Sequence, residues 1–360
     1  MSGICGFFDN GDKYLLKKML KSIQHSGGKE YIQMFDTCGF GITAVPSDNR
    51  RMYGFNEHGS IYVAIGGEID NRDELLGIVD NGLDDDNLSN PETLCLLYDH
   101  FGTKFIEKIA GPFVFVLWDD SKKVLLVSRD RLGEKPLCYY NNTDVFLFSS
   151  EIKGFLSYDE FRVKINSDSL TSYLTYLFVP TPHSIFDGVY KLPPGNYLTL
   201  QHHSNYTDKK YWDFSLAPIV SLDEKKILEK MDESFTDSVT SRMSQQKSVG
   251  VFLSAGIASN IVASKASHLS NKTVHTFTLG FDNEQYNELK FAREAAEYYG
   301  TAHQDFEIGA ELFDHLPQTI WYMDEPHGDS GLLSLFYISK KVREKGEYKI
   351  LTGDGGDELF

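Results

Sequence analysis

Residues 111–118 read GPFVFVLW, a short apolar run that opens on two turn-forming residues. Its length and its β-branched and aromatic side chains are typical of a buried β-strand. Similar runs lie on both sides of it along the chain, at 60–68 (SIYVAIGGE), 123–128 (KVLLVS) and 144–149 (DVFLFS). Apolar residues at every third or fourth position predict helices at 14–24 and 90–101, with Asn90 as the cap of the second. The first half of the chain is therefore expected to be rich in short strands.

The pattern changes in the second half of the chain. Residues 180–212 contain several prolines and glycines and end in a polar run, a composition that favours a connection between domains. Beyond it, predicted strands alternate with predicted helices, the strands at 248–253, 274–279 and 348–351 and the helices at 222–242 and 287–299. Such alternation indicates a parallel, doubly wound sheet. We therefore expect one domain over 1–205 and a second over 210–360.

The composition is that of a globular protein with two domains. Of the 360 residues, 41% are hydrophobic and 24% are charged, and no apolar run is long enough to span a membrane. The net charge of -17 disfavours binding to nucleic acid or to anionic lipid, which are themselves negative.

The first residues lack the basic and apolar regions of a signal peptide, which predicts a cytoplasmic protein. Cys5 is expected to be a small buried residue, and neither disulfides nor a zinc site are expected because the cysteines form no CxxC pair.

Eight short blocks resemble successive blocks of the asparagine synthetase family. They lie at 67–69 (GEI), 111–118 (GPFVFVLW), 128–137 (SRDRLGEKPL), 150–153 (SEIK), 191–195 (KLPPG), 276–281 (TFTLGF), 324–326 (DEP) and 352–360 (TGDGGDELF). Because they follow the order of the family, the resemblance covers essentially the whole chain. It implies an α+β N-terminal domain, an αββα sandwich of the Ntn-hydrolase type that acts as a type 2 glutamine amidotransferase. It implies that an α/β Rossmann-like ATP-pyrophosphatase domain follows.

The resemblance also implies a reaction and its ligands. In the family, the first domain releases ammonia from glutamine, and the second activates aspartate with ATP as an acyl-adenylate that ammonia converts to the amide. Glutamine, aspartate and ATP with Mg²⁺ are therefore the implied ligands, and a homodimer is a candidate assembly. The family continues beyond Phe360 with a further helical region, so the sequence is expected to be a fragment or the product of a shortened gene.

Five positions match the glutaminase site of the family, and several of them carry different residues. Ser2 stands at the cysteine nucleophile, and a serine hydroxyl is much harder to deprotonate than a thiol. Gly66 replaces the asparagine that stabilises the oxyanion, whereas Gly67, whose amide is the catalytic donor, and Glu68 match the family. Asn90 falls at or near the aspartate that holds the α-amine of glutamine, and it carries no charge. These changes predict an inactive glutaminase.

The phosphate-binding loop of the second domain is expected directly after the strand at 248–253. The family has Ser-Gly-Gly-x-Asp-Ser there, and this chain has SAGIAS at 254–259. By resemblance, Ser254, Gly256 and Ser259 remain to bind pyrophosphate at the start of a helix.

The metal and substrate positions of this domain match the family in part. Ala258 replaces an aspartate that holds Mg²⁺, while Asp357 matches the second metal-binding aspartate. Further positions match the contacts of adenine and of the acceptor substrate, with Asp354 as the catalytic candidate: Leu253, Leu279, Gly353 and Asp354. ATP and Mg²⁺ are implied as cofactors, and Ala258 argues against both.

Two hypotheses remain open for the activity. The chain is either an ATP-dependent amide ligase, with ammonia or an amine in place of glutamine, or a non-catalytic homologue that acts as a scaffold or partner subunit. Changes in both sites, with the folding blocks intact, favour the non-catalytic homologue, a pseudoenzyme. Ala258 beside Asp357 is the feature that separates the two hypotheses. The acceptor substrate and the oligomeric state are not specified by the sequence. Asp324 and Glu325 are compatible with a solvated helix end, and no chemistry is assigned to them.

Overall fold

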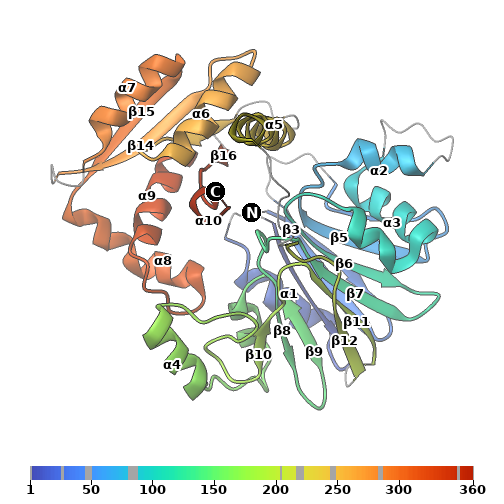
Figure 1. The fold of residues 1–360 in the computed structure, drawn as a ribbon. Helices are drawn as coiled ribbons and strands as arrows, with labels where there is room; N and C mark the ends of the chain where they lie inside the picture. Colours follow the sequence, from blue (N-terminus) through green and yellow to red (C-terminus); the bar gives the residue numbers. More distant parts are fainter. Residues whose placement is uncertain are drawn as a thin grey trace. The chain divides into compact units, whose positions relative to one another are not determined.

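The computed structural model describes residues 2–25, 28–44, 51–79, 88–202, 205–215, 223–243, 249–282, 287–346 and 349–359. The chain divides into two compact units (Figure 1). Unit 1 comprises residues 1–215 together with the short segment Asp324–Gly328, and unit 2 comprises residues 216–323 and 329–360. Unit 1 therefore includes a piece of chain from far along the sequence, and each unit is described by itself.

Unit 1 is built on two six-stranded sheets in which paired strands run antiparallel. The first has the order β10-β8-β9-β1-β3-β2, formed by β1 (Gly3–Phe8), β2 (Lys29–Met34), β3 (Cys38–Ala44), β8 (Cys138–Asn141), β9 (Phe146–Ser149) and β10 (Val189–Lys191). The second has the order β12-β11-β7-β6-β5-β4, formed by β4 (Tyr53–Phe55), β5 (Ile61–Gly67), β6 (Phe113–Asp119), β7 (Val124–Arg129), β11 (Asn196–His202) and β12 (Asn205–Lys210).

Alternating side chains along β1 show how the layers of unit 1 form. Ile4 and Phe8 are buried in the core between the two sheets, whereas Cys5 and Phe7 are buried in the core beneath the helical layer. That layer on the first sheet consists of α1 (Lys13–Ser22) and the 3-10 helix η3 (Ile152–Ser157). The second sheet is covered by α2 (Arg72–Ile78), α3 (Asn90–Phe101) and the 3-10 helix η2 (Gly102–Lys108), and unit 1 also contains α4 (Ser167–Tyr176). The αββα sandwich that the resemblance implies is confirmed.

Helix α3 begins at the predicted place but with a different cap. Ser89, and not Asn90, is the N-cap residue. The Ser89 backbone N–H and hydroxyl both donate to the Glu92 carboxylate, at 2.8 and 2.7 Å. This capping box satisfies backbone N–H groups at the start of the helix, and Asn90 is therefore the first helical residue.

The segment 180–212, expected to be a connection between domains, instead completes both sheets of unit 1. Strand β11 pairs with β7 on one side and β12 on the other, so that Leu198 lies opposite both Val127 and Asp208. Leu198 and Leu200 are buried between the sheets. The polar run is compatible with a strand because β12 is an edge strand, mostly exposed and held by backbone pairing.

Unit 2 contains a four-stranded parallel sheet, as the alternation of strands and helices predicts. Its order is β15-β14-β13-β16, formed by β13 (Gly250–Phe252), β14 (His275–Phe281), β15 (Ala302–Ile308) and β16 (Ile350–Leu351). The helices are α5 (Glu224–Met243), α6 (Ile257–Leu269), α7 (Leu289–Tyr299), the 3-10 helix η5 (Ala310–His315), α8 (Leu316–Met323), α9 (Gly331–Glu344) and α10 (Gly356–Leu359). Val251 packs with Ala263 of α6 and Ala292 of α7, whereas Phe277 packs with Ile338 of α9. Within the described residues, no helix has both the length and the apolar character needed to cross a membrane.

Candidate functional site

The two sheets of unit 1 bring the candidate nucleophile close to the candidate oxyanion position. Ser2 immediately precedes β1, and Gly66 lies near the end of β5. A Cβ built on Gly66 would lie 3.3 Å from the carbonyl oxygen of Ser2 and 3.4 Å from a side-chain methyl of Val114. A side chain at position 66 would therefore lie beside Ser2, and glycine supplies no amide group there.

The backbone geometry at Gly67 requires glycine. Its φ is +112°, and a Cβ at this position would lie 2.0 Å from the carbonyl oxygen of Pro112. The N–H of Glu68 donates to that same carbonyl at 2.8 Å. The Gly67-Glu68 turn at the end of β5 is thus explained by its backbone, before any catalytic role is considered.

The remaining candidate of this site, Asn90, is the first residue of α3 on the second sheet. Among the described contacts, none links Asn90 to Ser2. The structure therefore brings together Ser2, Gly66 and Gly67, while the substrate-binding role of Asn90 stays a prediction.

The cysteines of unit 1 are buried and offer no alternative nucleophile. Their exposed fractions are 0%, 0%, 1% and 5% for Cys5, Cys38, Cys95 and Cys138. Burial raises the pKa of the Cys5 thiol well above its usual range, and burial raises the pKa of Cys138 to about 12. The prediction that Cys5 is a small buried residue is confirmed.

In unit 2, the expected phosphate loop lies between β13 and α6 and is held by its own polar groups. The Ser254 and Ser259 hydroxyls are 2.9 Å apart, and the Gly256 N–H donates to the Ser254 hydroxyl at 3.1 Å. The Ser259 hydroxyl donates to the Gly256 carbonyl at 3.0 Å. The three residues expected to bind pyrophosphate are therefore together, but they bind one another.

Glu288 belongs to this loop although the sequence did not indicate it. Its carboxylate accepts a hydrogen bond from the Ala255 N–H at 3.0 Å. A backbone N–H at such a loop is the kind of group that binds a phosphate oxygen, and here the Glu288 carboxylate accepts its hydrogen bond. Glu288 lies at the start of the helix predicted at 287–299 and is the N-cap residue of α7, and neither position indicates a partner 33 residues away.

Ala258 lies against the glycine-rich segment that follows β16. A Cβ built on Gly353 would lie 2.9 Å from the Ala258 Cβ and 2.6 Å from the Ser259 nitrogen, and a Cβ on Gly356 would lie 2.8 Å from the Ala258 Cβ. The absence of side chains at both glycines lets the segment approach the start of α6. Position 258 thus faces the segment that carries Asp357.

These residues do not fit the magnesium site that the resemblance implies. Ala258 has no oxygen ligand, and Asp354 and Asp357 are exposed. In the part of the chain that the structure describes, no group of three or more acidic, histidine or cysteine side chains could hold a metal ion. Mg²⁺ in proteins is usually bound through one or two carboxylates together with phosphate oxygens and water. At position 258, where the resemblance implies a carboxylate, the side chain is a methyl group.

The two adenine candidates lie at the carboxyl end of the parallel sheet. Leu253 follows β13, where its N–H donates to the Phe277 carbonyl at 2.9 Å and its carbonyl accepts from the Thr278 hydroxyl at 2.5 Å. Leu279 lies in β14 and pairs with Phe306. Ligands of open parallel sheets bind at this end, so the position suits the prediction, although the backbone of Leu253 already has protein partners.

An αββα sandwich whose first strand follows Ser2, together with a parallel α/β unit that carries a phosphate-type loop, defines a two-domain glutamine amidotransferase architecture. Residues 1–212 match the family of the glutamine amidotransferase domain, and residues 230–360 match the asparagine synthase family. The chain belongs to the glutamine amidotransferase family and is asparagine synthetase-like within it.

Two curated relatives illustrate this similarity. The chain is 29% identical to the glutamine-hydrolysing asparagine synthetase 1 of Bacillus subtilis, over 99% of this chain and 58% of that protein. It is 29% identical to the putative glutamine-hydrolysing asparagine synthetase 2 of Methanocaldococcus jannaschii, over 100% of this chain and 75% of that protein. The chain thus spans little more than half the length of the first relative. Among solved structures, the glutamine phosphoribosylpyrophosphate amidotransferase of Bacillus subtilis matches 84% of this chain and 65% of its own, with a TM-score of 0.42 and 13% identity.

Proposed function

We propose that this chain is a non-catalytic asparagine synthetase-like protein that serves as a scaffold or partner subunit. Residues 1–205 would be its amidotransferase-like domain, residues 210–360 its ATP-pyrophosphatase-like domain, and the cytoplasm its compartment. The observation that carries the proposal is Ala258, which lies against Gly353 and Gly356 and offers no ligand to a metal ion.

The charge around the phosphate loop supports this proposal. ATP is strongly negative, and the chain carries a net charge of -17. Without a second carboxylate to hold Mg²⁺, the phosphates would remain poorly neutralised beside the Glu288 carboxylate. The loop N–H that this carboxylate occupies is no longer free for a phosphate oxygen.

The glutaminase position supports the proposal independently. Ser2 replaces the thiol that the resemblance implies, and Gly66 leaves no amide beside it. Each site therefore lacks groups that the resemblance implies, while the described sheets and helices of each unit are formed.

An ATP-dependent amide ligase that uses ammonia or an amine is the second candidate. It is favoured by Ser254, Gly256 and Ser259, which keep the loop at the start of the 13-residue helix α6, where the helix dipole attracts anions. In this case Asp357 and the phosphates alone would hold Mg²⁺, and aspartate or another carboxylic acid would be the acceptor.

Calorimetric titration with ATP and Mg²⁺ tests the proposal. The unaltered protein is expected to bind with a Kd of roughly 1 mM or weaker. A Glu288→Gln variant should bind about twofold to fivefold more tightly, because it removes one negative charge near the phosphates. Glu294→Gln, the same change at an exposed residue of the same helix, is the control and should leave the Kd unchanged. Micromolar binding by the unaltered protein would favour the ligase.

A further inference from the structure

The segment Asp324–Gly328 belongs to unit 1, although the residues before and after it belong to unit 2. The expectation of a solvated helix end is wrong here, because the side chains of Asp324 and Glu325 are only 10% and 16% exposed. We propose that this segment is a clasp. Lys153 and Lys191 of unit 1 form a binding surface for an acidic dipeptide. The core of unit 1 stays closed to solvent only while Asp324 and Glu325 occupy that surface.

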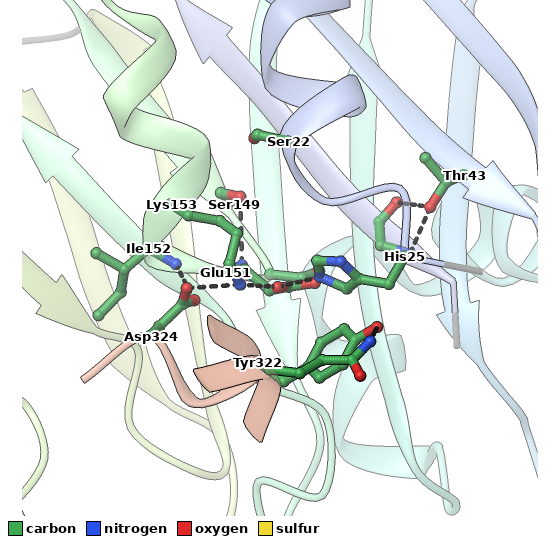
Figure 2. A network of polar contacts seen from close by, with 12 residues as sticks. Ser22, His25, Thr43, Ser149, Glu151, Ile152, Lys153, Tyr322 and Asp324 are labelled. Carbon is green, nitrogen blue, oxygen red and sulfur yellow. Dashed lines mark hydrogen bonds and ion pairs between the residues drawn. The ribbon is translucent and has the colours of Figure 1, made fainter. Parts of the chain in front are cut away.

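The first half of the clasp binds through both oxygens of Asp324, as Figure 2 shows. Its Oδ1 lies 2.6 Å from the Lys153 ammonium, and its Oδ2 accepts from the Ile152 N–H at 2.6 Å. Lys153 is 4% exposed and also forms an ion pair with Glu151, which in turn lies 2.5 Å from the His25 ring. The buried ammonium group therefore lies between two carboxylates, one from the neighbouring Glu151 and one from Asp324, far along the sequence.

Asp324 is held in a costly conformation. Its φ is +65°, in the left-handed region that residues other than glycine seldom adopt. Burial raises the pKa of its carboxyl group even though Lys153 acts in the opposite direction. A buried and backbone-strained carboxylate persists where its partners stabilise it, and Lys153 and Ile152 are those partners.

The second half of the clasp repeats the arrangement with Glu325. One carboxylate oxygen forms an ion pair with Lys191, and the other accepts from the Ile185 N–H at 3.1 Å. The Gly328 N–H then donates to the Leu177 carbonyl at 2.7 Å. The segment is thus bound by two lysines and by backbone groups of unit 1 along its length.

The clasp surface is bonded to β1, the strand that Ser2 precedes. Ser150, next to Glu151, bonds to Ile4 of β1 twice: the Ile4 N–H donates to its hydroxyl at 2.9 Å, and its N–H donates to the Ile4 carbonyl at 2.7 Å. Loss of the clasp would leave Lys153 with one carboxylate fewer and the Ile152 N–H without its acceptor. Opening of unit 1 is therefore expected to begin around β1 and the segment that carries Lys153.

Thiol labelling of the complete chain tests the clasp, because all four cysteines lie in unit 1 and are buried. Their labelling rate under native conditions reports the opening of this unit alone. The double variant Asp324→Ala/Glu325→Ala should label about 100-fold faster, because truncating one side of buried ion pairs leaves uncompensated charge. Hydrogen exchange of β14 in unit 2 should change less than about threefold.

An exposed ion pair of unit 1 supplies the matched control. Lys164 and Asp187 lie 2.7 Å apart, with side chains 75% and 44% exposed. Asp187→Ala should alter labelling less than about fivefold, since exposed pairs contribute little. Equal labelling rates for the double variant and the unaltered protein would overturn the clasp. So would an Asp187→Ala variant that labels as fast as the double variant, or hydrogen exchange of β14 that the double variant accelerates as much as the labelling. If the double variant does not fold, Glu325→Gln should still raise the rate about tenfold, and no increase would overturn the proposal.

Discussion

Purified protein incubated with glutamine is expected to release no glutamate above a mock preparation. The loss of one oxyanion donor lowers a rate by about two to three orders of magnitude, and Gly66 provides no such side chain beside Ser2. A serine hydroxyl is also a weaker nucleophile than a thiolate near neutral pH, so the two changes act on the same step. Cys5 cannot compensate, because it is 0% exposed and burial keeps its thiol protonated.

A Ser2→Ala variant is the control for this expectation. It should behave like the unaltered protein, since neither is expected to form an acyl-enzyme. Steady glutamate release that disappears in Ser2→Ala would show that the serine works as a nucleophile, and the proposal of an inactive glutaminase would then be withdrawn.

Restoring a carboxylate at position 258 is expected to strengthen Mg·ATP binding about tenfold or more. The change is Ala258→Asp combined with Ala255→Gly, which returns the loop to the pattern of the family. The new side chain would face the segment bearing Asp357, because Ala258 already lies against Gly353 and Gly356. Hydrogen bonds to charged groups contribute about 1.5–3 kcal/mol, and a carboxylate contact with Mg²⁺ of the same size would correspond to roughly one to two orders of magnitude in Kd. Calorimetric titration with ATP should show the gain with Mg²⁺ and lose it with a chelator.

The neighbouring residue offers a matched control for this prediction. Ile257 begins α6 and is 79% exposed, so Ile257→Asp adds the same charge to the same helix end on a side chain that is mostly in solvent. It should give no Mg²⁺-dependent gain. A similar gain in both variants would attribute the effect to general charge. Micromolar binding by the unaltered protein, with no gain in Ala258→Asp/Ala255→Gly, would mean that another group supplies the metal ligand.

Much of the fold follows from local patterns in the sequence. The apolar run at 111–118 corresponds to β6 and the run at 60–68 to β5, because buried strands need continuous or alternating apolar side chains. The strands at 248–253 and 274–279 likewise became neighbours in a parallel sheet. Strand β12 could not be predicted in this way, because an edge strand with exposed side chains carries no apolar pattern.

The candidate sites were predictable where a motif is continuous and not where it depends on distant partners. Ser254 and Ser259 are close in sequence, so the loop could be expected before its hydrogen bonds were seen. The bond from Ala255 to Glu288 joins residues 33 apart, and the bond from Ile152 to Asp324 joins residues 172 apart. The sequence alone does not distinguish such charged residues from solvated ones, because only the folded chain brings their partners to them.

ATP-dependent release of pyrophosphate tests the central claim most directly. The protein would be mixed with ATP, Mg²⁺, aspartate and ammonia, and pyrophosphate would be followed against a reaction without protein. We predict no release above that background, because Ala258 supplies no metal ligand and Glu288 occupies a loop N–H. Steady release that increases with protein concentration, requires a carboxylic acid acceptor and disappears in Asp357→Asn would contradict the account and identify an amide ligase.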